Sequence, residues 1–544
     1  MARWLDARVG FGLVAALYLL CFPYHPALRS PNELCRLWQS RSLVDHGTVV
    51  INETLREFGM VGDLSCVARV KVGEVEQLVS CVQPPPAGAQ LIEMKYYPSK
   101  APMLSFLGAP IYAVLKALKA PVTESTQVLF SRLFITVLPT LVMLVFLRRF
   151  LAAFVSQGAA DTLVVVYALG TMAFSYAEQF LSHQLTAVLL FGTFYSAWRV
   201  QRGDWKERGL LVAGAFAGAV VFTEYTGALG VVCIAAYVLA ARWKQWPSLG
   251  RAVGLVIAGA APFLLGLMVY HQACFGSPLT SGYKFLNDAA YQGWHLGGFL
   301  GIRFPDPRAF VLSAFSPLRG FFTLSPFLLL AFVGLGPLKV AEKAQWVMVL
   351  VLLAANAYFT SSFTYDSWGW TTGPRHLTPV LPFLMLPVAL GLERLGATSK
   401  VSFSLAAGLC LSSVIAMSLV TQVNYVPNDL EYTDAQGVSH LSTSLFGLAV
   451  PLVREGVWPV SWLNAVVANP GPGALIVLLI VGVAAWVFSR FRAVSAVPAL
   501  VLVAVVAHLG LLALVTDHHS ASVSAKNFLK QSWAAPSGQL YSWW

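Results

Sequence analysis

The ionisable side chains most able to do chemistry in this chain lie beside or inside long apolar runs. A charge near the middle of a bilayer costs roughly 2.5 to 3.5 kcal/mol unless it is paired or hydrated. Carboxylates can act as general bases, whereas lysine, arginine and histidine donate hydrogen bonds to phosphate oxygens. A base beside a phosphate clamp would suit a reaction whose leaving group is a lipid phosphate. The set comprises Glu33, Arg36, Lys100, Glu178, His183, Glu224, Asp366, Arg375 and His376.

The stretch SPNELCRLWQSRSLVDHG, residues 30–47, gives Glu33 two possible roles. Ser30 and Glu33 have the spacing of a helix capping box, and Pro31 occupies the favoured first helical position. Glu33 is therefore either a cap or a carboxylate held at a membrane surface for chemistry. The two roles are compatible because a capped helix also fixes the carboxylate. Arg36 lies one turn further on, where it can pair with Glu33 across the helix surface.

Composition predicts an all-α polytopic membrane protein. Hydrophobic residues make up 57% of the chain and charged residues only 11%, and the mean hydropathy is +0.67. These values lie outside the range of soluble domains. The net charge of +11 is explained by lysine and arginine in short cytoplasmic loops. Because no basic patch is interleaved with aromatic residues, we predict the lipid bilayer, and not nucleic acid, as a partner.

Basic clusters between the apolar runs define the predicted topology, because such clusters stay on the cytoplasmic side. They place the N-terminus in the cytoplasm and the C-terminus outside, with about thirteen crossings in a range of about 11 to 14. The predicted segments are a first transmembrane helix (1–26), a first outer loop (27–126), transmembrane helices (127–271), a second outer loop (272–319), transmembrane helices (320–421), a third outer loop (422–472), the last transmembrane helices (473–516) and an outer C-terminal tail (517–544).

Two apolar runs are predicted to behave unusually. The run 209–241 has basic loops at both ends, so it must cross twice as two short helices that break near Glu224 and Tyr225. The run 101–119 begins outside and is followed by 127–147, which must end inside. We therefore expect 101–119 to lie along the outer leaflet or re-enter it as part of a juxtamembrane helical loop.

The first outer loop contains a predicted β-hairpin over residues 64–82. A two-residue turn formed by the dipeptide Gly-Glu would pair Lys71 with Glu76 and place Cys66 opposite Cys81. An outer compartment is oxidising, so these cysteines form either a disulfide or two free apolar thiols.

The sequence predicts no metal site and no cofactor. The other five cysteines lack metal-ligand spacing. The run Asp517, His518 and His519 offers ligand types without further partners, and nothing indicates a divalent cation.

Three motifs resemble the GT-C superfamily of membrane glycosyltransferases, in the branch of the protein O-mannosyltransferases and bacterial aminoarabinose transferases. They are SPNELCRLWQSRSLVDHG, KYYPSKAPMLSFL and WGWTTGPRHLTPVLPFL. The segments FGSPLTSGY and SPLRGFFTLSP are similar to uncharacterised bacterial members. The resemblance covers roughly residues 8 to 420 in order and topology, through short and degenerate motifs. It implies a GT-C-like helical bundle.

The resemblance also implies transfer of a sugar from a polyprenyl-phosphate donor to an acceptor at the periplasmic face of the inner membrane. The acceptor is a glycan, a lipid or a protein. Asn32 and Glu33 stand where the family has Asp-Glu, Lys100 matches the Lys-Pro motif with Ala101 inserted, and Arg375 matches the late basic residue. The family's usual base is the first acid of the pair, and the Asn32 amide cannot accept a proton. Either Glu33 takes this role or the chain is an inactive relative.

The mechanism that we predict is inverting substitution at the anomeric carbon, with Glu33 as the base. Lys100, Arg375 and His376 would stabilise the charge on the departing lipid phosphate. The possible supporting residues are Asn32, Arg36, His183, Glu224 and Asp366.

Each assignment has a structural alternative. Lys100 can snorkel at the outer leaflet, and Arg375 and His376 can be interfacial anchors beside Trp368 and Trp370. Glu224 fits a solvated turn, and His183 fits a structural histidine. The alternative functional class is a transporter or flippase of a lipid-linked or anionic substrate. Such a protein should have ionisable groups at mid-bilayer or on both faces, whereas here they gather on the predicted outer side.

Overall fold

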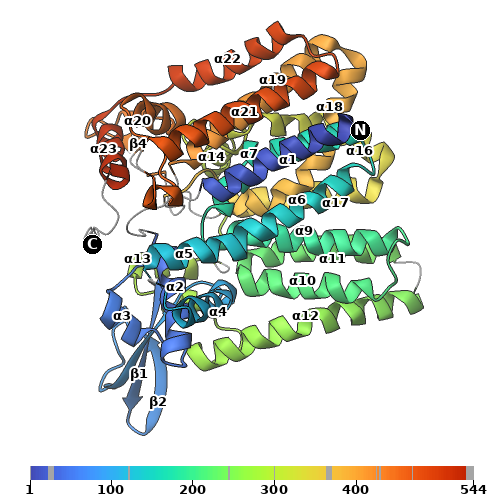
Figure 1. The fold of residues 1–544 in the computed structure, drawn as a ribbon. Helices are drawn as coiled ribbons and strands as arrows, with labels where there is room; N and C mark the ends of the chain where they lie inside the picture. The colour runs from blue at the N-terminus through green and yellow to red at the C-terminus, as the bar shows by residue number, and fades with distance from the viewer. Residues whose placement is uncertain are drawn as a thin grey trace. The chain divides into compact units, whose positions relative to one another are not determined.

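The computed structural model describes residues 2–21, 30–120, 123–242, 246–298, 301–362, 370–423, 426–427, 430–467 and 470–534. The chain forms two compact units (Figure 1). Unit 1 comprises Met1–Pro26, Thr136–Gln179 and Pro305–Trp544, and unit 2 comprises Ala27–Ile135 and Phe180–Phe304. Asp366 and Trp368 lie outside the described residues. The predicted transmembrane segments and loops do not correspond to these two units. The units are defined by which residues pack together, whereas the segments were defined by membrane topology.

Helices long and apolar enough to cross a membrane confirm the predicted polytopic class. Within the described residues there are six: Glu124–Leu151, Leu249–Phe275, Lys343–Ser362, Arg375–Thr398, Lys400–Thr421 and Gly471–Ala493. Shorter apolar helices accompany them: Ala7–Leu20, Met103–Ala117, Gly209–Thr223, Tyr225–Ala240, Pro326–Ala341, Ser444–Arg454 and Pro498–Leu514. The number of crossings and the orientation of the termini stay predictions.

Unit 1 is helical, and its closest helix packing depends on small residues. A Cβ atom added to Gly334 would lie 1.7 Å from the Pro387 carbonyl oxygen, so only glycine allows α16 and α18 to approach this closely. The main helices are α1 (Ala2–Leu20), α6 (Leu138–Leu151), α7 (Gln157–Gly170), α8 (Met172–Ala177), α14 (Pro307–Phe315), α16 (Leu330–Ala341), α17 (Lys343–Ser362), α18 (Leu381–Thr398), α19 (Lys400–Thr421), α20 (Val450–Arg454), α21 (Gly471–Ala493), α22 (Pro498–Leu514) and α23 (Ser520–Ala534).

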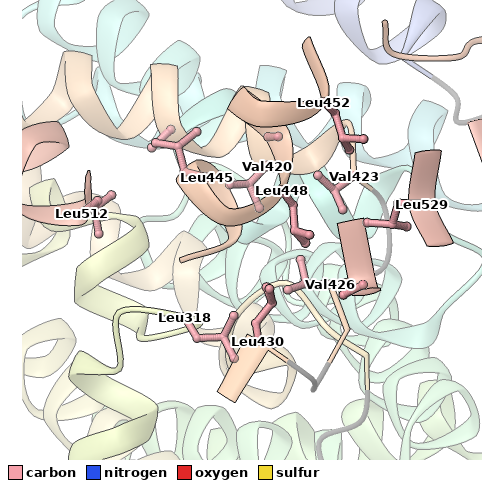
Figure 2. Packing of buried hydrophobic residues seen from close by; sticks show 13 residues of the cluster. Leu318, Val420, Val423, Val426, Leu430, Leu445, Leu448, Leu452, Leu512 and Leu529 are labelled. Carbon is pink, nitrogen blue, oxygen red and sulfur yellow. The ribbon is translucent and has the colours of Figure 1, made fainter. Parts of the chain in front are cut away.

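A buried apolar cluster joins the C-terminal end of α19 to the segments that follow it (Figure 2). Val420 and Leu448 are fully buried there, with Leu512 from α22 and Leu529 from α23 packed into the same cluster. Beside it lies a small sheet of β4 (Glu431–Thr433) and β5 (Ser439–Leu441), which the sequence analysis did not predict.

Unit 2 combines helices with a three-stranded antiparallel sheet in the order β2-β1-β3, and Figure 1 shows this sheet beside α2. Its elements are α2 (Pro31–Asp45), α3 (Asn52–Phe58), β1 (Leu64–Val72), β2 (Val75–Ser80), β3 (Gln90–Pro98), α4 (Met103–Ala117), α5 (Glu124–Arg132), α9 (Ser182–Gln201), α10 (Gly209–Thr223), η2 (Tyr225–Gly227), α11 (Ala228–Arg242), α12 (Trp246–Phe275), η3 (Gly282–Phe285) and α13 (Ala289–Leu296).

The predicted break in the run 209–241 is confirmed. Helix α10 ends at Thr223, Glu224 has an extended backbone, and α11 begins at Ala228 after the short η2 turn. Helices α10 and α12 pack so closely that a Cβ atom at Gly214 would lie 2.1 Å from a backbone oxygen of α12. The absence of a side chain at Gly214 allows this approach. The run 101–119 is helical as α4, and its position at the outer leaflet stays a prediction.

The predicted hairpin and its register are confirmed. Strands β1 and β2 pair Lys71 with Glu76, and Cys66 and Cys81 form a disulfide. A disulfide that closes a loop of 15 residues contributes about 3 kcal/mol in the chain-entropy account. The third strand, β3, was not predicted.

His440 on β5 connects the small sheet to the segment after α22. Its Nδ1 lies 2.6 Å from an Asp517 oxygen and its Nε2 lies 3.1 Å from an Asp434 oxygen. Ionised carboxylates only accept hydrogen bonds, so the imidazole donates from both nitrogens and is charged. The hydrogen bonds to Asp517 and Asp434 raise the pKa of His440. The Tyr432 ring stacks on that of His440, and the His519 ring lies next to it at a tilted angle.

We predict that this connection weakens at alkaline pH. A histidine whose pKa is raised in the folded state stabilises fully below its ordinary value of about 6.5, and this stabilisation is lost as the pH rises through the raised value. Amide hydrogen exchange over residues 431–441, corrected for intrinsic rates, should therefore accelerate as the pH rises through the raised pKa of His440. In His440→Gln the corrected exchange should not depend on pH, and equal profiles for the two proteins would contradict the prediction.

Candidate active site

The first turn of α2 positions Glu33, and its predicted start is confirmed. The Ser30 hydroxyl caps the helix by accepting from the Glu33 N–H at 3.4 Å, and Pro31 lies in the first turn. Glu33 in this turn and Arg36 in the next are both buried. Capping and proline fix the backbone here, so the two side chains leave the helix in defined directions.

The Glu33 carboxylate forms a buried ion pair with Arg132, the last residue of α5. Arg132 Nε donates to Oε1 at 3.0 Å, and Nη2 donates to Oε2 at 2.9 Å. The Phe180 N–H also donates to Oε1. The Glu33 side chain is 0% exposed and that of Arg132 is 2% exposed. Such a bidentate pair satisfies the hydrogen-bonding groups of both side chains and holds α2 against α5.

Arg36 links α2 to the start of α9. Its guanidinium donates to the side chain of Asn32 and, at 3.5 Å, to the Ser182 hydroxyl. Ser182 donates in turn to the Glu224 carboxylate at the α10–α11 break. His183 Nδ1 lies 3.9 Å from the same carboxylate. The structure therefore brings together four of the predicted supporting residues: Asn32, Arg36, His183 and Glu224.

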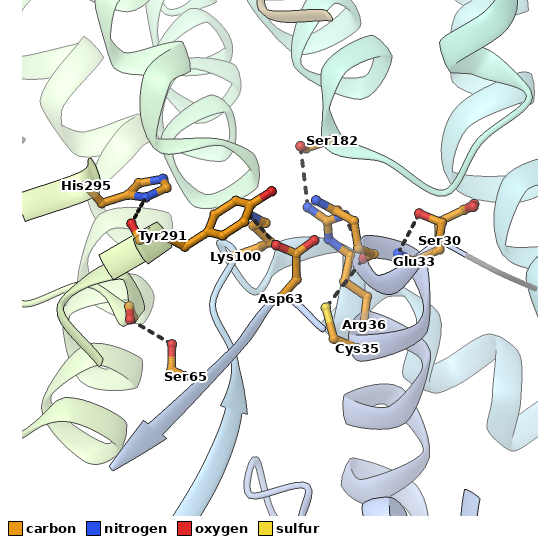
Figure 3. Close-up of polar contacts among 12 residues, drawn as sticks. Ser30, Glu33, Cys35, Arg36, Asp63, Ser65, Lys100, Ser182, Tyr291 and His295 are labelled. Atoms are coloured by element: carbon orange, nitrogen blue, oxygen red, sulfur yellow. Dashed lines mark hydrogen bonds and ion pairs between the residues drawn. The ribbon is translucent and has the colours of Figure 1, made fainter. Parts of the chain in front are cut away.

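Lys100 forms its ion pair with Asp63, which precedes β1. The Lys100 Nζ lies 3.1 Å from Asp63 Oδ1, and their side chains are 15% and 23% exposed. Lys100 also lies 5.3 Å from the centre of the Tyr283 ring, which stacks on His295. In Figure 3 the Asp63–Lys100 pair lies between Arg36 and His295.

The charges of Arg36, Asp63, Lys100 and Glu224 influence the pKa values of nearby side chains. Burial raises the pKa of the Tyr283 phenol; the charge of Lys100 opposes this shift, and those of Glu224 and Asp63 add to it. Burial likewise raises the pKa of the Cys35 thiol to about 12; the charges of Arg36 and Lys100 oppose this shift, and that of Asp63 adds to it. Figure 3 shows Arg36, Asp63 and Lys100 in one region beside the start of α2.

The predicted residues of unit 1 form a separate set. Arg375 and His376 begin the short η6 helix (Arg375–Val380), where both are partly buried and His376 packs edge-on against Phe359. Arg375 and the buried Arg319 both act electrostatically on Tyr176. Lys100 belongs to unit 2, so a joint phosphate clamp with Arg375 and His376 stays a prediction. Glu178, also in unit 1, is fully buried.

Sequence reasoning missed Arg132, Asp63 and Arg319. Arg132 had a usable signal, because a charged residue inside the apolar run 127–147 requires a partner. Arg319 lies in SPLRGFFTLSP, where its charge among apolar residues gave the same signal. Asp63 gave none, since an aspartate between a short helix and a strand is common in turns. In the described part of the chain, no group of three or more His, Cys, Asp or Glu residues is placed to hold a metal ion.

Comparison with solved structures identifies the fold. No model of a known protein family matches the chain, and no curated sequence matches it. The fold is similar to that of the membrane protein ArnT, in agreement with the helical bundle that the sequence resemblance implied. The crystal structure of ArnT from Cupriavidus metallidurans in the apo state matches with a TM-score of 0.51 and 16% identity, covering 94% of this chain and 78% of that chain. The structure of the same ArnT bound to undecaprenyl phosphate matches with a TM-score of 0.52, 15% identity and the same coverage.

We predict that Glu33→Gln destabilises unit 2, because it leaves the Arg132 charge buried without its ionised partner. Breaking a buried pair in this way costs about 3 to 5 kcal/mol. Thermal unfolding in detergent should show a clear loss for this variant. Adding Arg132→Met should recover part of it, since no buried charge then remains.

Glu53→Gln is the matched control, because Glu53 pairs with Arg56 at the surface and its side chain is 57% exposed. Exposed pairs contribute at most about 1 kcal/mol. If Glu33→Gln and Glu53→Gln unfold at the same temperature, the structural importance of the buried pair is contradicted.

Proposed function

We propose that this protein is an integral-membrane glycosyltransferase that takes a sugar from a polyprenyl-phosphate donor. The proposal is supported by the ArnT-like fold and by the crystal structure of the similar ArnT bound to undecaprenyl phosphate. The observation that carries it is the position of Lys100. Its ammonium lies 3.1 Å from the Asp63 carboxylate, and its side chain is 15% exposed.

The reaction is nucleophilic substitution at the anomeric carbon with inversion. An acceptor hydroxyl attacks this carbon, and the bond to the phosphate oxygen breaks. Lys100 stabilises the charge on the departing polyprenyl phosphate by a charge-assisted hydrogen bond. Arg375 and His376 complete this clamp in the proposal.

The base predicted from the sequence is Glu33, and its carboxylate already forms an ion pair with Arg132. A general base must come within hydrogen-bond reach of the proton that it removes. Glu33 would have to accept this proton while Arg132 and the Phe180 N–H also bind its carboxylate. The supporting residues Asn32, Arg36, His183 and Glu224 adjoin this position, and Asp366 stays a predicted member of the site.

We place the reaction at the periplasmic face of the inner membrane, with the N-terminus in the cytoplasm. The acceptor is a glycan, a lipid or a protein, and the sugar is a hexose or a pentose. This assignment follows from the predicted loop orientation, in which α2 and Lys100 lie in the first outer loop.

We predict that Lys100→Met lowers kcat/KM about 10²- to 10³-fold, the usual effect of losing one preorganised donor to a developing negative charge. The assay follows undecaprenyl phosphate released from a panel of undecaprenyl-phosphate hexoses and pentoses, with bacterial envelope lipids as the acceptor source. Lys71→Met is the control, because Lys71 lies on β1 in a surface pair with Glu74 and is 40% exposed.

Each outcome of this assay has a defined meaning. The transferase is supported if the wild type and Lys71→Met release undecaprenyl phosphate and Lys100→Met does so far more slowly. Transport of the donor across vesicles without release would support the flippase alternative. Binding of undecaprenyl phosphate without release or transport would indicate the inactive GT-C relative that Asn32 makes possible.

A further inference from the structure

A polar cavity in unit 1 lies between α23 and the two short helices η8 (Ser444–Ala449) and α20. Its volume is about 370 Å³, and its lining includes Arg454, His518, Ser522 and Lys526. This volume is within the range of roughly 300 to 1,000 Å³ that is usual for small-molecule sites. The proposed transfer reaction uses none of these residues, so the cavity calls for an occupant of its own.

We propose that this cavity binds the phosphate of an anionic phospholipid from the surrounding membrane. The group that it recognises is a phosphate with one negative charge, which a phosphatidylglycerol headgroup supplies. The inference goes beyond the proposed function and does not rest on it, because binding of such a lipid requires neither a sugar donor nor turnover.

Cationic side chains from two elements line the cavity. Arg454 is exposed at the end of α20, and Lys526 lies in the second turn of α23 with its side chain 19% exposed. A guanidinium can donate two parallel hydrogen bonds to a phosphate, and an ammonium adds a compact positive charge. The imidazole of His518 and the hydroxyl of Ser522 add further hydrogen-bonding groups. The lining therefore has the chemistry of a phosphate site.

Glu455 holds two lysines of α23 on the side of the helix that faces the cavity. It forms an ion pair with Lys526 and, at 3.0 Å, with Lys530 one turn further along. Hydrogen bonds from both lysines lower the pKa of Glu455, so its carboxylate is ionised. An ammonium has three N–H donors, so each lysine can bind Glu455 and a phosphate oxygen together. With Arg454, the two lysines give an excess of positive charge over Glu455, which favours an anion over a zwitterion.

Exposed apolar residues indicate that the occupant is a lipid and not a free phosphate. Helix α22 exposes Leu502, Val506 and Leu514 along one face, and Leu514 at its end is 85% exposed. His518 follows Leu514 by four residues, which span at most about 14 Å. The exposed Val523 lines the cavity itself. A phospholipid can therefore place its phosphate in the cavity and its acyl chains along α22.

A lipid in this cavity holds α23 against α20. Leu529 on α23 and Leu452 on α20 already belong to one buried apolar cluster (Figure 2), and the phosphate adds a polar connection between the same two helices. Phe528 on α23 also packs edge-on against Trp370, with ring centres 5.5 Å apart. Trp370 lies five residues before Arg375. The lipid thus stabilises the C-terminal helix and, through it, the segment that leads to the late basic motif.

Calorimetric titration of the full-length protein in detergent with dioctanoyl phosphatidylglycerol tests this inference. We expect saturable binding, with dioctanoyl phosphatidylcholine and inorganic phosphate each binding at least about tenfold more weakly. Arg454→Gln should raise the Kd for the phosphatidylglycerol about 10- to 100-fold, the usual loss for a hydrogen bond to a charged group. Among the residues that the structure describes, no ion pair involves Arg454, so this change should leave the fold intact.

Amide hydrogen exchange locates the bound lipid. Dioctanoyl phosphatidylglycerol should slow exchange over residues 444–455 and 518–530 in the wild type, and Arg454→Gln should lose this protection at the same lipid concentration. Arg492→Gln is the matched control, because Arg492 is also exposed in the last turn of an apolar helix, α21, but does not line the cavity. This variant should keep the wild-type Kd and the wild-type protection.

Several results would overturn the inference. Equal losses in Arg454→Gln and Arg492→Gln would show general attraction to anionic lipid, and protection confined to other segments would place the lipid elsewhere. Inorganic phosphate that binds as tightly as the phosphatidylglycerol would assign the cavity to free phosphate. Lys526→Gln is a second variant, in which Glu455 keeps Lys530, and unchanged binding in both cavity variants would reject the site. Failure of the sugar transfer assay would leave all of these results unaffected.

Discussion

The Glu33–Arg132 ion pair is the interaction on which the arrangement of unit 2 depends. Both side chains are buried, and an uncompensated charge in such surroundings costs several kcal/mol. The pair satisfies each charge with its partner and adds the Phe180 N–H as a third participant. It therefore connects the start of α2, the end of α5 and the segment that leads into α9. The first turn of α2 can keep its place only while this pair is intact.

The rest of the polar site follows from that fixed turn. Once Glu33 is held, Arg36 lies one turn on, where it reaches Ser182 at the start of α9. Ser182 then reaches Glu224, whose position depends on the break between α10 and α11. The carboxylates differ in burial and in partners: Glu33 is paired with Arg132, Glu224 accepts from Ser182 and Thr226, and Asp63 is partly exposed beside Lys100. Buried polar groups that are satisfied in this way make one another's positions more specific.

The sequence predicted the features of this fold that depend on local rules. The start of α2 followed from a cap and a proline, the hairpin register from a two-residue turn, and the α10–α11 break from the positions of basic loops. Strand β3 was missed because it pairs with β1 and not with its sequence neighbour β2, so the proline-rich connection 81–89 does not set its register. The Glu33–Arg132 pair joins residues 99 positions apart, and the Asp63–Lys100 pair depends on the strand pairing that was missed. Long-range partners of this kind are fixed by packing and not by local spacing.

The Asn32 side chain forms a specific hydrogen bond in this structure, which is consistent with the proposed enzyme. Its amide oxygen accepts from Arg36, so it supports the guanidinium that reaches Ser182. A carboxylate at this position would form an ion pair with Arg36 and would be less available as a base. The residues at positions 32 and 36 therefore form a hydrogen-bonded pair that connects α2 to the start of α9. The Asn32 amide makes this connection without adding a carboxylate next to the buried Glu33–Arg132 pair.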